Sequence, residues 1–341
     1  SSEYFINFYV KTRAAENLIP ENHLIAKKQF QLKKSEQKAI VEASGDFGRL
    51  KVKKTKEEID IHNDQIQVKF DKNQGRISSY IFNGKELLKK GPRINFWRAP
   101  TDNDFGNGFP QRGPMWKEAS ENYSVTSAEV NSKTKNAVTV EFKYTIPAVS
   151  STYTSEYTVN ADGSILVKNN FDFGGKEDVS ELPRFGMNMI LPNEYDQVKW
   201  YGRGPHENYR DRKQSAFVGV YEASVSDLYF PYSRPQENGY RTENRWVELT
   251  NDSGNGLKFV GLPLISFSAH HNYISDFDPG EKKQQRHTND IKPRDLVSLN
   301  IDYGQTGVGG DNSWGARPYE KYQLKPDDYS YSFLIEPVTA D

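Results

Sequence analysis

Four short segments of the sequence combine aromatic rings with glycine and with short amide or carboxylate side chains. They are residues 96–106, 200–212, 235–239 and 307–314. Sugars need this combination, because their CH faces stack on indole or phenol rings and their hydroxyl groups require hydrogen-bond donors and acceptors. The same residue types also dominate tight turns for backbone reasons. The four segments therefore indicate either a carbohydrate site or a set of well-satisfied turns.

Carboxylates within these segments are candidates for acid and base chemistry. Glycoside hydrolysis uses two carboxyl groups at a defined separation, and Glu207, Glu237 and Asp311 qualify because they lie in the polar segments. Arginines such as Arg203 and Arg212 lie close by in the sequence, which favours charge-paired structural carboxylates. The sequence therefore assigns no catalytic pair within this chain.

Three patterns that resemble ion-binding motifs do not meet the requirements of a site. Asp102 and Asp104 resemble the start of a calcium loop, but the glycine and glutamate that such a loop needs do not follow at the right spacing. Residues 307–310 are rich in glycine, yet no strand–helix unit follows to cradle a phosphate. His270 and His271 would point to opposite faces of a strand. We expect no metal site in this chain, and surface or hydrogen-bonded positions for both histidines.

The elements that must position these segments are almost all strands. Apolar side chains alternate over residues 66–70 and 138–146, which is the period of a half-buried strand. Residues 83–84 and 160–163 carry hairpin signals, because Asn, Asp and Gly are favoured in tight turns. Only residues 114–122 favour a short helix, with proline in its first turn. Regular short strands separated by turns predict an all-β fold, here a large antiparallel two-sheet sandwich.

The N-terminal residues form a pattern of their own. Residues 4–10 and 26–32 both favour strands, but two strands alone do not bury a face stably. We therefore interpret residues 1–45 as the end of another, incomplete β domain, residues 46–58 as a linker, and residues 59–341 as the sandwich. A chain that begins inside a strand pattern is also expected to be a fragment of a longer protein.

Composition narrows the class of protein. Hydrophobic residues make up 35% of the 341 residues and charged residues 27%, which suits a protein with a packed core. The formal net charge of −1 predicts no general attraction to nucleic acid or to an anionic membrane. The chain has no cysteine, so disulfides and thiolate chemistry are excluded. No apolar run approaches the ~20 residues of a membrane span, and we expect a soluble, cytoplasmic or periplasmic protein.

The polar segments occur in the order found in a known family. The chain resembles the C-terminal domain of family-2 β-galactosidases, which is a separate small subunit in some bacterial two-chain forms. The resemblance covers about residues 59–341, and the 45 or so residues at the start resemble the end of the immunoglobulin-like domain that precedes it in one-chain enzymes. The motifs that carry it are residues 98–104, 202–209 with 211–212, 231–232 with 235–239, and 307–314.

The resemblance implies a galactose mutarotase-like supersandwich with a partial immunoglobulin-like appendage. It implies that the catalytic glutamates belong to a barrel domain outside this chain, so that the chain alone is inactive and contains no catalytic residue. Magnesium and sodium ions are expected in the full enzyme, outside this chain. The implied partners are the barrel and N-terminal domains and a β-galactoside substrate, in an enzyme that is a homo-oligomer.

The resemblance also implies two site features within this chain. Trp314 would reach the sugar-binding pocket and form part of one wall of the active site. The segment that begins with Gly106, Asn107 and Gly108 corresponds to a mobile loop beside the pocket, although its sequence differs in detail from the family pattern. We expect Trp314 to be partly exposed in this chain.

Two other functions stay open at this stage. The chain could be a free-standing carbohydrate-binding module, which would bind galactose or lactose in isolation. It could also be a mutarotase-like enzyme, which would need a histidine and a carboxylate facing one pocket. His206 and Glu207 are the one such pair within a motif, but neighbours on a strand diverge, and this counts against the second alternative.

Overall fold

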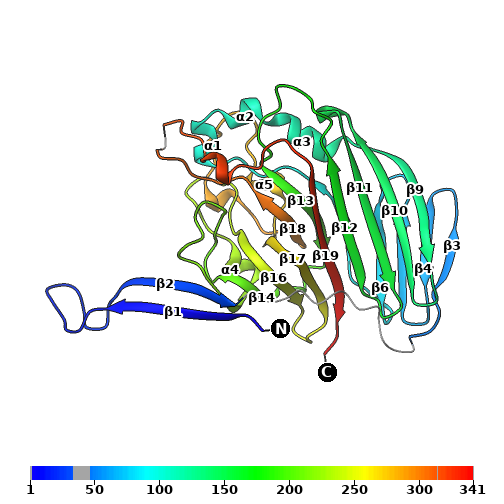
Figure 1. Cartoon of the computed structure of the whole chain (residues 1–341), viewed down its shortest axis with the longest axis horizontal. Coiled ribbons are helices and arrows are strands. Elements are labelled where there is room, and N and C mark those ends of the chain that lie inside the picture. Colours follow the sequence, from blue (N-terminus) through cyan, green and yellow to red (C-terminus); the bar gives the residue numbers. More distant parts are fainter. Residues whose placement is uncertain (1, 34–46, 313, 341) are drawn as a thin grey trace.

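A computed structural model describes residues 2–33, 47–312 and 314–340. The last two ranges form the main body, which is built from a twelve-stranded and a five-stranded antiparallel sheet. A separate two-stranded hairpin projects away from the main body (Figure 1). The expected all-β antiparallel sandwich is therefore confirmed. In the part of the chain that is described, no helix combines the length and apolar character needed to cross a bilayer.

The projecting hairpin contains the two strands predicted near the N-terminus. Strand β1 (Tyr4–Lys11) pairs antiparallel with β2 (Leu24–Lys33). Large apolar side chains remain exposed along both strands, among them Phe8 and Leu32. A two-stranded sheet cannot cover its own faces, which explains this exposure. That the hairpin belongs to an immunoglobulin-like domain stays a prediction.

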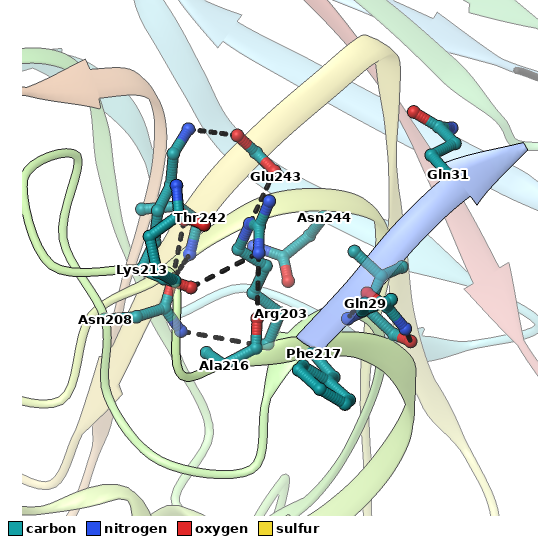
Figure 2. Close-up of polar contacts among 12 residues, drawn as sticks. Gln29, Gln31, Arg203, Asn208, Lys213, Ala216, Phe217, Thr242, Glu243 and Asn244 are labelled. Atoms are coloured by element: carbon teal, nitrogen blue, oxygen red, sulfur yellow. Dashed lines mark hydrogen bonds and ion pairs between the residues drawn. The ribbon is translucent and has the colours of Figure 1, made fainter. Parts of the chain in front are cut away.

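Glu3 and Gln29 make hydrogen bonds that attach the hairpin to the main body. The carboxylate of Glu3 accepts hydrogen bonds from the Arg245 guanidinium and from the Tyr201 hydroxyl. The side-chain amide of Gln29 both donates to the carbonyl oxygen of Val218, at 2.9 Å, and accepts from its N–H, at 2.7 Å. Gln29 thus occupies both backbone groups of an edge-strand residue, beside Phe217 (Figure 2).

The five-stranded sheet covers one side of the core. Its order is β3-β4-β5-β6-β7, and β6 and β7 are joined by the predicted turn, where Asn83 and Gly84 have φ values of 47° and 79°. The strands are β3 (Lys51–Lys54), β4 (Glu58–His62), β5 (Ile66–Asp71), β6 (Arg76–Phe82) and β7 (Lys85–Glu86).

The interpretation of residues 46–58 as a linker needs correction. Strand β3 lies within this range and pairs with β4, where Val52 lies opposite Ile61. Leu50, just before β3, is fully buried. Lysines dominate residues 51–54 and hide the strand signal, because an edge strand can expose charged side chains to water.

The twelve-stranded sheet forms the rest of the body. Its main path is β15-β14-β16-β17-β19-β12-β11-β10-β9, while β13 pairs with β18 and β8, and β18 also pairs with β17. The strands are β8 (Lys90–Asn95), β9 (Ser124–Lys133), β10 (Ala137–Ile146), β11 (Ser151–Asn160), β12 (Ile165–Asp172), β13 (Arg184–Leu191), β14 (Gln197–Gly204), β15 (Phe217–Ser224), β16 (Arg241–Thr250), β17 (Gly256–His270), β18 (Val297–Gln305) and β19 (Tyr329–Val338).

Aromatic side chains fill the space between the two sheets. The ring of Phe70 on β5 lies 5.9 Å from that of Phe142 on β10 and 5.3 Å from that of Tyr157 on β11. Strand β5 alternates between buried and half-buried residues, as its sequence pattern predicted. Burial of apolar surface of this kind contributes roughly 25 cal/mol per Å², so the two sheets stabilise each other.

Short helices lie along one end of the sheets, where α1, α2 and α3 follow one another (Figure 1). The predicted helix is α3, and α1 replaces a segment that we expected to be a loop. A capping box starts α1: the Thr101 hydroxyl accepts from the Asp104 N–H, and the Asp104 carboxylate accepts from the Thr101 N–H. The helices are α1 (Asp102–Gly106), α2 (Phe109–Arg112), α3 (Pro114–Glu121), α4 (Val225–Leu228) and α5 (Ile274–Phe277), with 3₁₀ turns at Pro147–Val149, Thr288–Asp290 and Glu320–Tyr322.

Candidate functional site

The four polar segments meet around one hollow of about 270 Å³. They are separated by up to some two hundred residues in the sequence, so the antiparallel sheets bring them together. The first segment contributes the start of α1, the second the turn after β14, the third the loop before β16, and the fourth the loop after β18. The lining residues are Thr101, Asp102, Asn103, Tyr209, Arg212, Tyr232, Gln236, Glu237, Val308 and Gly309.

A buried ion pair fixes the first wall of the hollow. Arg98, which is 1% exposed, donates to both carboxylate oxygens of Asp104 at 3.0 and 3.1 Å. Burial opposes the charge of Arg98, but nearby acidic groups, Asp104 first and then Glu237, outweigh this effect together, and the pKa of Arg98 is raised. Arg98 also donates to the carbonyl oxygens of Thr306 and Gly307. The pair therefore joins α1 to the start of the loop that contains Trp314.

The second segment is held by Arg203 and Asn208. Arg203 pairs with Glu243 and donates to the carbonyl oxygens of Lys213 and Ala216 (Figure 2). These contacts close the stretch between β14 and β15 into a fixed turn. The side chain of Asn208 accepts from the backbone N–H of Thr242 at 3.0 Å, which ties the turn to β16.

Glu207, one of the candidate acids, is engaged in this turn. Its carboxylate accepts from the backbone N–H of Gly239 at 2.7 Å and contacts both Arg212 and the Tyr232 hydroxyl. The Arg212 guanidinium also lies over the Tyr209 ring, 5.1 Å from its centre. Glu207 therefore links the second and third segments. This geometry supports the structural interpretation of that carboxylate.

His206 and Glu207 diverge, as expected for neighbouring residues. His206 is exposed and its Nε2 lies 2.9 Å from the Ser215 hydroxyl, whereas Glu207 is 8% exposed and directed to other partners. The His206 side chain is only partly covered, and this partial burial, together with nearby cations, lowers its pKa. The two side chains do not form the acid–base pair that a mutarotase would need.

Glu237 belongs to a second buried cluster beneath the hollow. Gln305 donates to its carboxylate at 3.1 Å, and Arg184 lies at 3.4 Å. Arg184 also pairs with Asp302 at 3.0 Å. Burial raises the pKa of Glu237 and raises that of Asp302 to about 7, although the Arg184 charge opposes both shifts. Asp302 is fully buried, so it does not reach a bound substrate.

Sequence reasoning did not identify Arg184 and Asp302. Both lie in continuous strand patterns, β13 and β18, without glycine-rich or aromatic surroundings that mark a polar loop. The available signal was their charge, because an arginine and an aspartate inside otherwise apolar or amide-rich strands are seldom buried unless they are paired. The partner of each could not be read from the sequence alone.

Trp314 is 93% exposed, so the prediction of exposure is confirmed and exceeded. The loop that follows β18 projects beside α1 at the upper left of the view (Figure 1). Asp311, the third candidate acid, lies in this loop and accepts from the Tyr319 hydroxyl at 2.6 Å. Because Val308 and Gly309 also line the hollow, Trp314 lies on a loop that borders it.

The segment expected to be mobile lies beside the Trp314 loop. Helix α1 ends at Gly106, Asn107 is its C-cap, and Gly108 has a left-handed φ of 74°. A Cβ placed on Gly315 would lie 3.5 Å from the carbonyl oxygen of Gly106. Arg112 donates to both the backbone and the side-chain oxygen of Asn107. Motion of residues 106–108 stays a prediction.

The adjacent histidines both make hydrogen bonds, as predicted. His270 Nε2 lies 3.0 Å from the carbonyl oxygen of Asn238, and His271 lies between the Leu296 carbonyl and the Asp196 carboxylate. Burial lowers the pKa of His270 to about 4. Across residues 2–33, 47–312 and 314–340, no group of three or more His, Asp or Glu could hold a metal ion.

The fold and the hollow define a β-sandwich domain whose polar loops gather at one end. Comparison with protein families then identifies it: the model described as "Beta galactosidase small chain" matches residues 62–335. The chain belongs to this family.

Two curated relatives illustrate the match. A β-galactosidase of Priestia megaterium is 35% identical over 271 residues, covering 79% of this chain and 25% of the relative. One of Streptococcus thermophilus is 31% identical over 346 residues, covering 99% of this chain and 32% of the relative. The chain therefore spans between a quarter and a third of the length of these relatives.

Among solved structures, the chain is similar to a mutarotase-related enzyme and to an epimerase. A galactose mutarotase related enzyme of Lactobacillus acidophilus has a TM-score of 0.43 at 12% identity, covering 83% of this chain and 98% of the other. A galactose 1-epimerase of the same species has a TM-score of 0.46 at 8% identity, with 86% and 100% covered.

Proposed function

We propose that this chain is the C-terminal part of a β-galactosidase that hydrolyses terminal β-galactosides with retention, and that it forms one wall of the active site. The observation that carries the proposal is the position of Trp314. Its indole is 93% exposed, whereas Trp97, Trp116 and Trp200 are at most 6% exposed. An indole exposed at the edge of a polar hollow offers an apolar face on which a sugar can stack.

The carboxylates around the hollow support a positioning role for this chain. Retaining glycosidases need two carboxyl groups about 5–5.5 Å apart, one as nucleophile and one as acid and base. The Glu207 carboxylate is hydrogen-bonded to the backbone N–H of Gly239. Glu237 and Asp302 both pair with the buried Arg184. We therefore assign the catalytic pair to the remainder of the enzyme, and expect no hydrolysis by this chain alone.

The function proposed for Trp314 is binding and orientation. Stacking of the indole on the sugar or its leaving group would hold the glycosidic bond in place for carboxylates supplied by the barrel domain, and would exclude water from that face. The segment Gly106–Gly108, which lies beside the same loop, is the element proposed to move beside the pocket.

The remaining parts of the proposal concern partners. The matched regions cover only 25% and 32% of the two relatives, which supports barrel and N-terminal domains as the partners of this chain. The exposed apolar strands of the hairpin are proposed to pair with the missing strands of the preceding domain. Magnesium and sodium ions are proposed to bind outside this chain, in an enzyme that is a homo-oligomer.

Complementation tests the proposal. The remainder of such an enzyme, lacking the region equivalent to this chain, is mixed with the purified chain and assayed with a chromogenic β-galactoside. We expect no turnover by either part alone and turnover by the mixture. Turnover by the chain alone that disappears when Glu207 or Glu237 is replaced would show instead that the catalytic groups lie here.

A free-standing carbohydrate-binding module is the second candidate, favoured by the polar hollow itself. Titration calorimetry of the chain with galactose and lactose distinguishes the two functions. A module would bind with measurable heat, whereas one wall of a shared site would show weak or no binding. Binding in the absence of complementation would favour the module.

A further inference from the structure

The Trp314 loop has a base whose backbone is held at four consecutive residues. Arg98 donates to the carbonyl oxygens of Thr306 and Gly307. The side-chain amide of Asn103 donates to the carbonyl oxygen of Val308 at 3.0 Å. These contacts come from the buried ion-pair region and from α1, so the start of the loop moves only with the main body.

Asp211 provides the last contact of this base. Its Oδ2 accepts from the backbone N–H of Gly309 at 2.8 Å. The carboxylate is also packed tightly against the turn, because a Cβ placed on Gly307 would lie 2.7 Å from the Asp211 carboxyl carbon. Asp211 thus packs against Gly307 and is hydrogen-bonded to Gly309, the first residue of the Gly309–Gly310 pair.

Beyond Gly309 the side-chain hydrogen bonds are local. Within residues 310–312 and 314, the side-chain hydrogen bonds stay inside the loop and its following turn: Asn312 accepts from the Trp314 N–H, and Asp311 accepts from Tyr319. Gly310 lies close to the backbone of Ala316, where a Cβ would come within 2.5 Å of the carbonyl oxygen. Gly310 and Ala316 therefore lie side by side just beyond the base of the loop.

We propose that Asp211 is a positioning residue for Trp314, with Asn103 as its counterpart on α1. Together they fix the carbonyl of Val308 and the N–H of Gly309, and so set the direction in which the turn that contains the indole leaves the body. This inference rests on the proposed function, because the orientation of Trp314 matters to the reaction only if the indole contacts the sugar.

The chemistry of Asp211 explains why this side chain suits the position. A carboxylate that accepts a backbone N–H makes a stronger bond than a neutral acceptor, and glycine has the widest backbone freedom when it is not held. Removing the acceptor in Asp211→Ala would release the Gly309–Gly310 pair. Asp211→Asn keeps an acceptor oxygen at the same place and is the conservative variant.

Fluorescence anisotropy decay of Trp314 measures this directly in the chain, without any enzymatic assay. Three of the other tryptophans are buried and Trp246 is half-buried, and subtraction of a Trp314→Phe sample isolates the signal. We expect a larger fast component in Asp211→Ala and recovery in Asp211→Asn. Asp328→Ala is the matched control, because Asp328 also accepts a backbone N–H at 2.8 Å, from Phe173 on another loop, and it should leave the signal unchanged.

Kinetics of the complete enzyme then test the link to the reaction. We expect Asp211→Ala to raise KM about threefold to tenfold, with a smaller effect on kcat, because misplacement of a binding group weakens substrate positioning. Unchanged anisotropy in Asp211→Ala overturns the inference. So does an unchanged KM in Asp211→Ala when Trp314→Ala raises it, whereas an unchanged KM in Trp314→Ala would overturn the proposed function itself.

Discussion

The carboxylate of Glu3 lies 2.7 Å from both Nε and Nη2 of Arg245, although 242 positions separate the two residues in the sequence. The Tyr201 hydroxyl and the Gln31 amide also donate to this carboxylate, each at 2.8 Å. One acidic side chain therefore connects the projecting hairpin to β14 and β16. Bidentate arginine–carboxylate pairs fix orientation as well as distance, so the hairpin is held in a defined direction.

Replacing Glu3 with Gln should loosen the hairpin without unfolding the main body. The change removes the charge that pairs with Arg245, and hydrogen bonds to charged groups contribute about 1.5–3 kcal/mol each. We expect faster trypsin cleavage within residues 11–33, measured by mass spectrometry of the early fragments. Glu16→Gln at the exposed hairpin tip is the control, and equal cleavage rates in both variants would contradict the prediction.

The same contact predicts how the attachment depends on pH. The Arg245 hydrogen bond, against a smaller effect of burial, lowers the pKa of Glu3 in the folded chain. The attachment is therefore fully present above the unfolded-state pKa and is lost as pH falls through the lower folded-state pKa. Hydrogen exchange of the hairpin amides, followed from neutral to acidic pH, should show this loss as reduced protection of those amides.

Much of the fold followed from local sequence patterns. The turn at Asn83-Gly84 was predictable because both residues tolerate the positive φ that a two-residue hairpin requires. Helix α1 was missed although Thr101 and Asp104 form a capping box, since glycine and proline around it favour a loop. Strand β3 was missed because its lysines conceal an edge strand.

The loops of the candidate site were predictable from the sequence, whereas the buried charge cluster beneath the hollow was not. Segments rich in aromatic, amide and glycine residues were recognisable, and the exposure of Trp314 followed from the polar residues before it. The pairing of Arg184 with Asp302 was not predictable, because residues more than a hundred positions apart become neighbours only through the register of β13 and β18. The pairing of Arg184 with two carboxylates, Glu237 and Asp302, arises only in the tertiary fold.

Stability should fall as pH rises from about 4 to about 7 because of Asp302. Burial raises the folded-state pKa of this carboxyl to about 7 from an ordinary value of 3.8, so the folded chain binds more protons than the unfolded chain in that interval. The contribution is present below pH 4 and is lost as pH rises through 7. Asp302→Asn should flatten this part of the curve, as measured by urea unfolding across the pH range.

The exposed carboxylate of Asp172 is the control for this experiment. Asp172→Asn should leave the pH dependence of unfolding unchanged, because the exposed side chain of Asp172 lies outside the buried cluster around Arg184. A curve for Asp302→Asn that falls as steeply as that of the unmodified chain would contradict the assignment. The slope would then belong to Glu237, whose pKa burial also raises.

Gly186 on β13 should not tolerate a side chain. A Cβ at this position would lie 1.9 Å from Oδ1 of Asp302, which is buried and paired with Arg184. Overpacking of this kind costs typically about 1–3 kcal/mol, so Gly186→Ala should lower the free energy of unfolding by that amount in urea.

Gly304 on β18 provides a matched comparison. A Cβ there would meet only Arg210, at 3.6 Å, which is an ordinary contact. Gly304→Ala should therefore change the free energy of unfolding by less than about 0.5 kcal/mol. Equal destabilisation by the two variants would show that the space beside Asp302 is not what constrains Gly186.

Replacing Trp314 with Ala in the complete enzyme should weaken substrate binding and spare the fold. The indole is 93% exposed, so its removal leaves the packed core intact and the unfolding free energy of the chain should change little. Loss of a stacking plate should cost roughly 1–3 kcal/mol, which corresponds to about a fivefold to 150-fold rise in KM. Trp314→Phe should retain part of the binding, because a smaller ring still offers a face. Steady-state kinetics with a chromogenic β-galactoside would measure both variants, and an unchanged KM and kcat, or failure of Trp314→Ala to fold, would instead make Trp314 a structural residue.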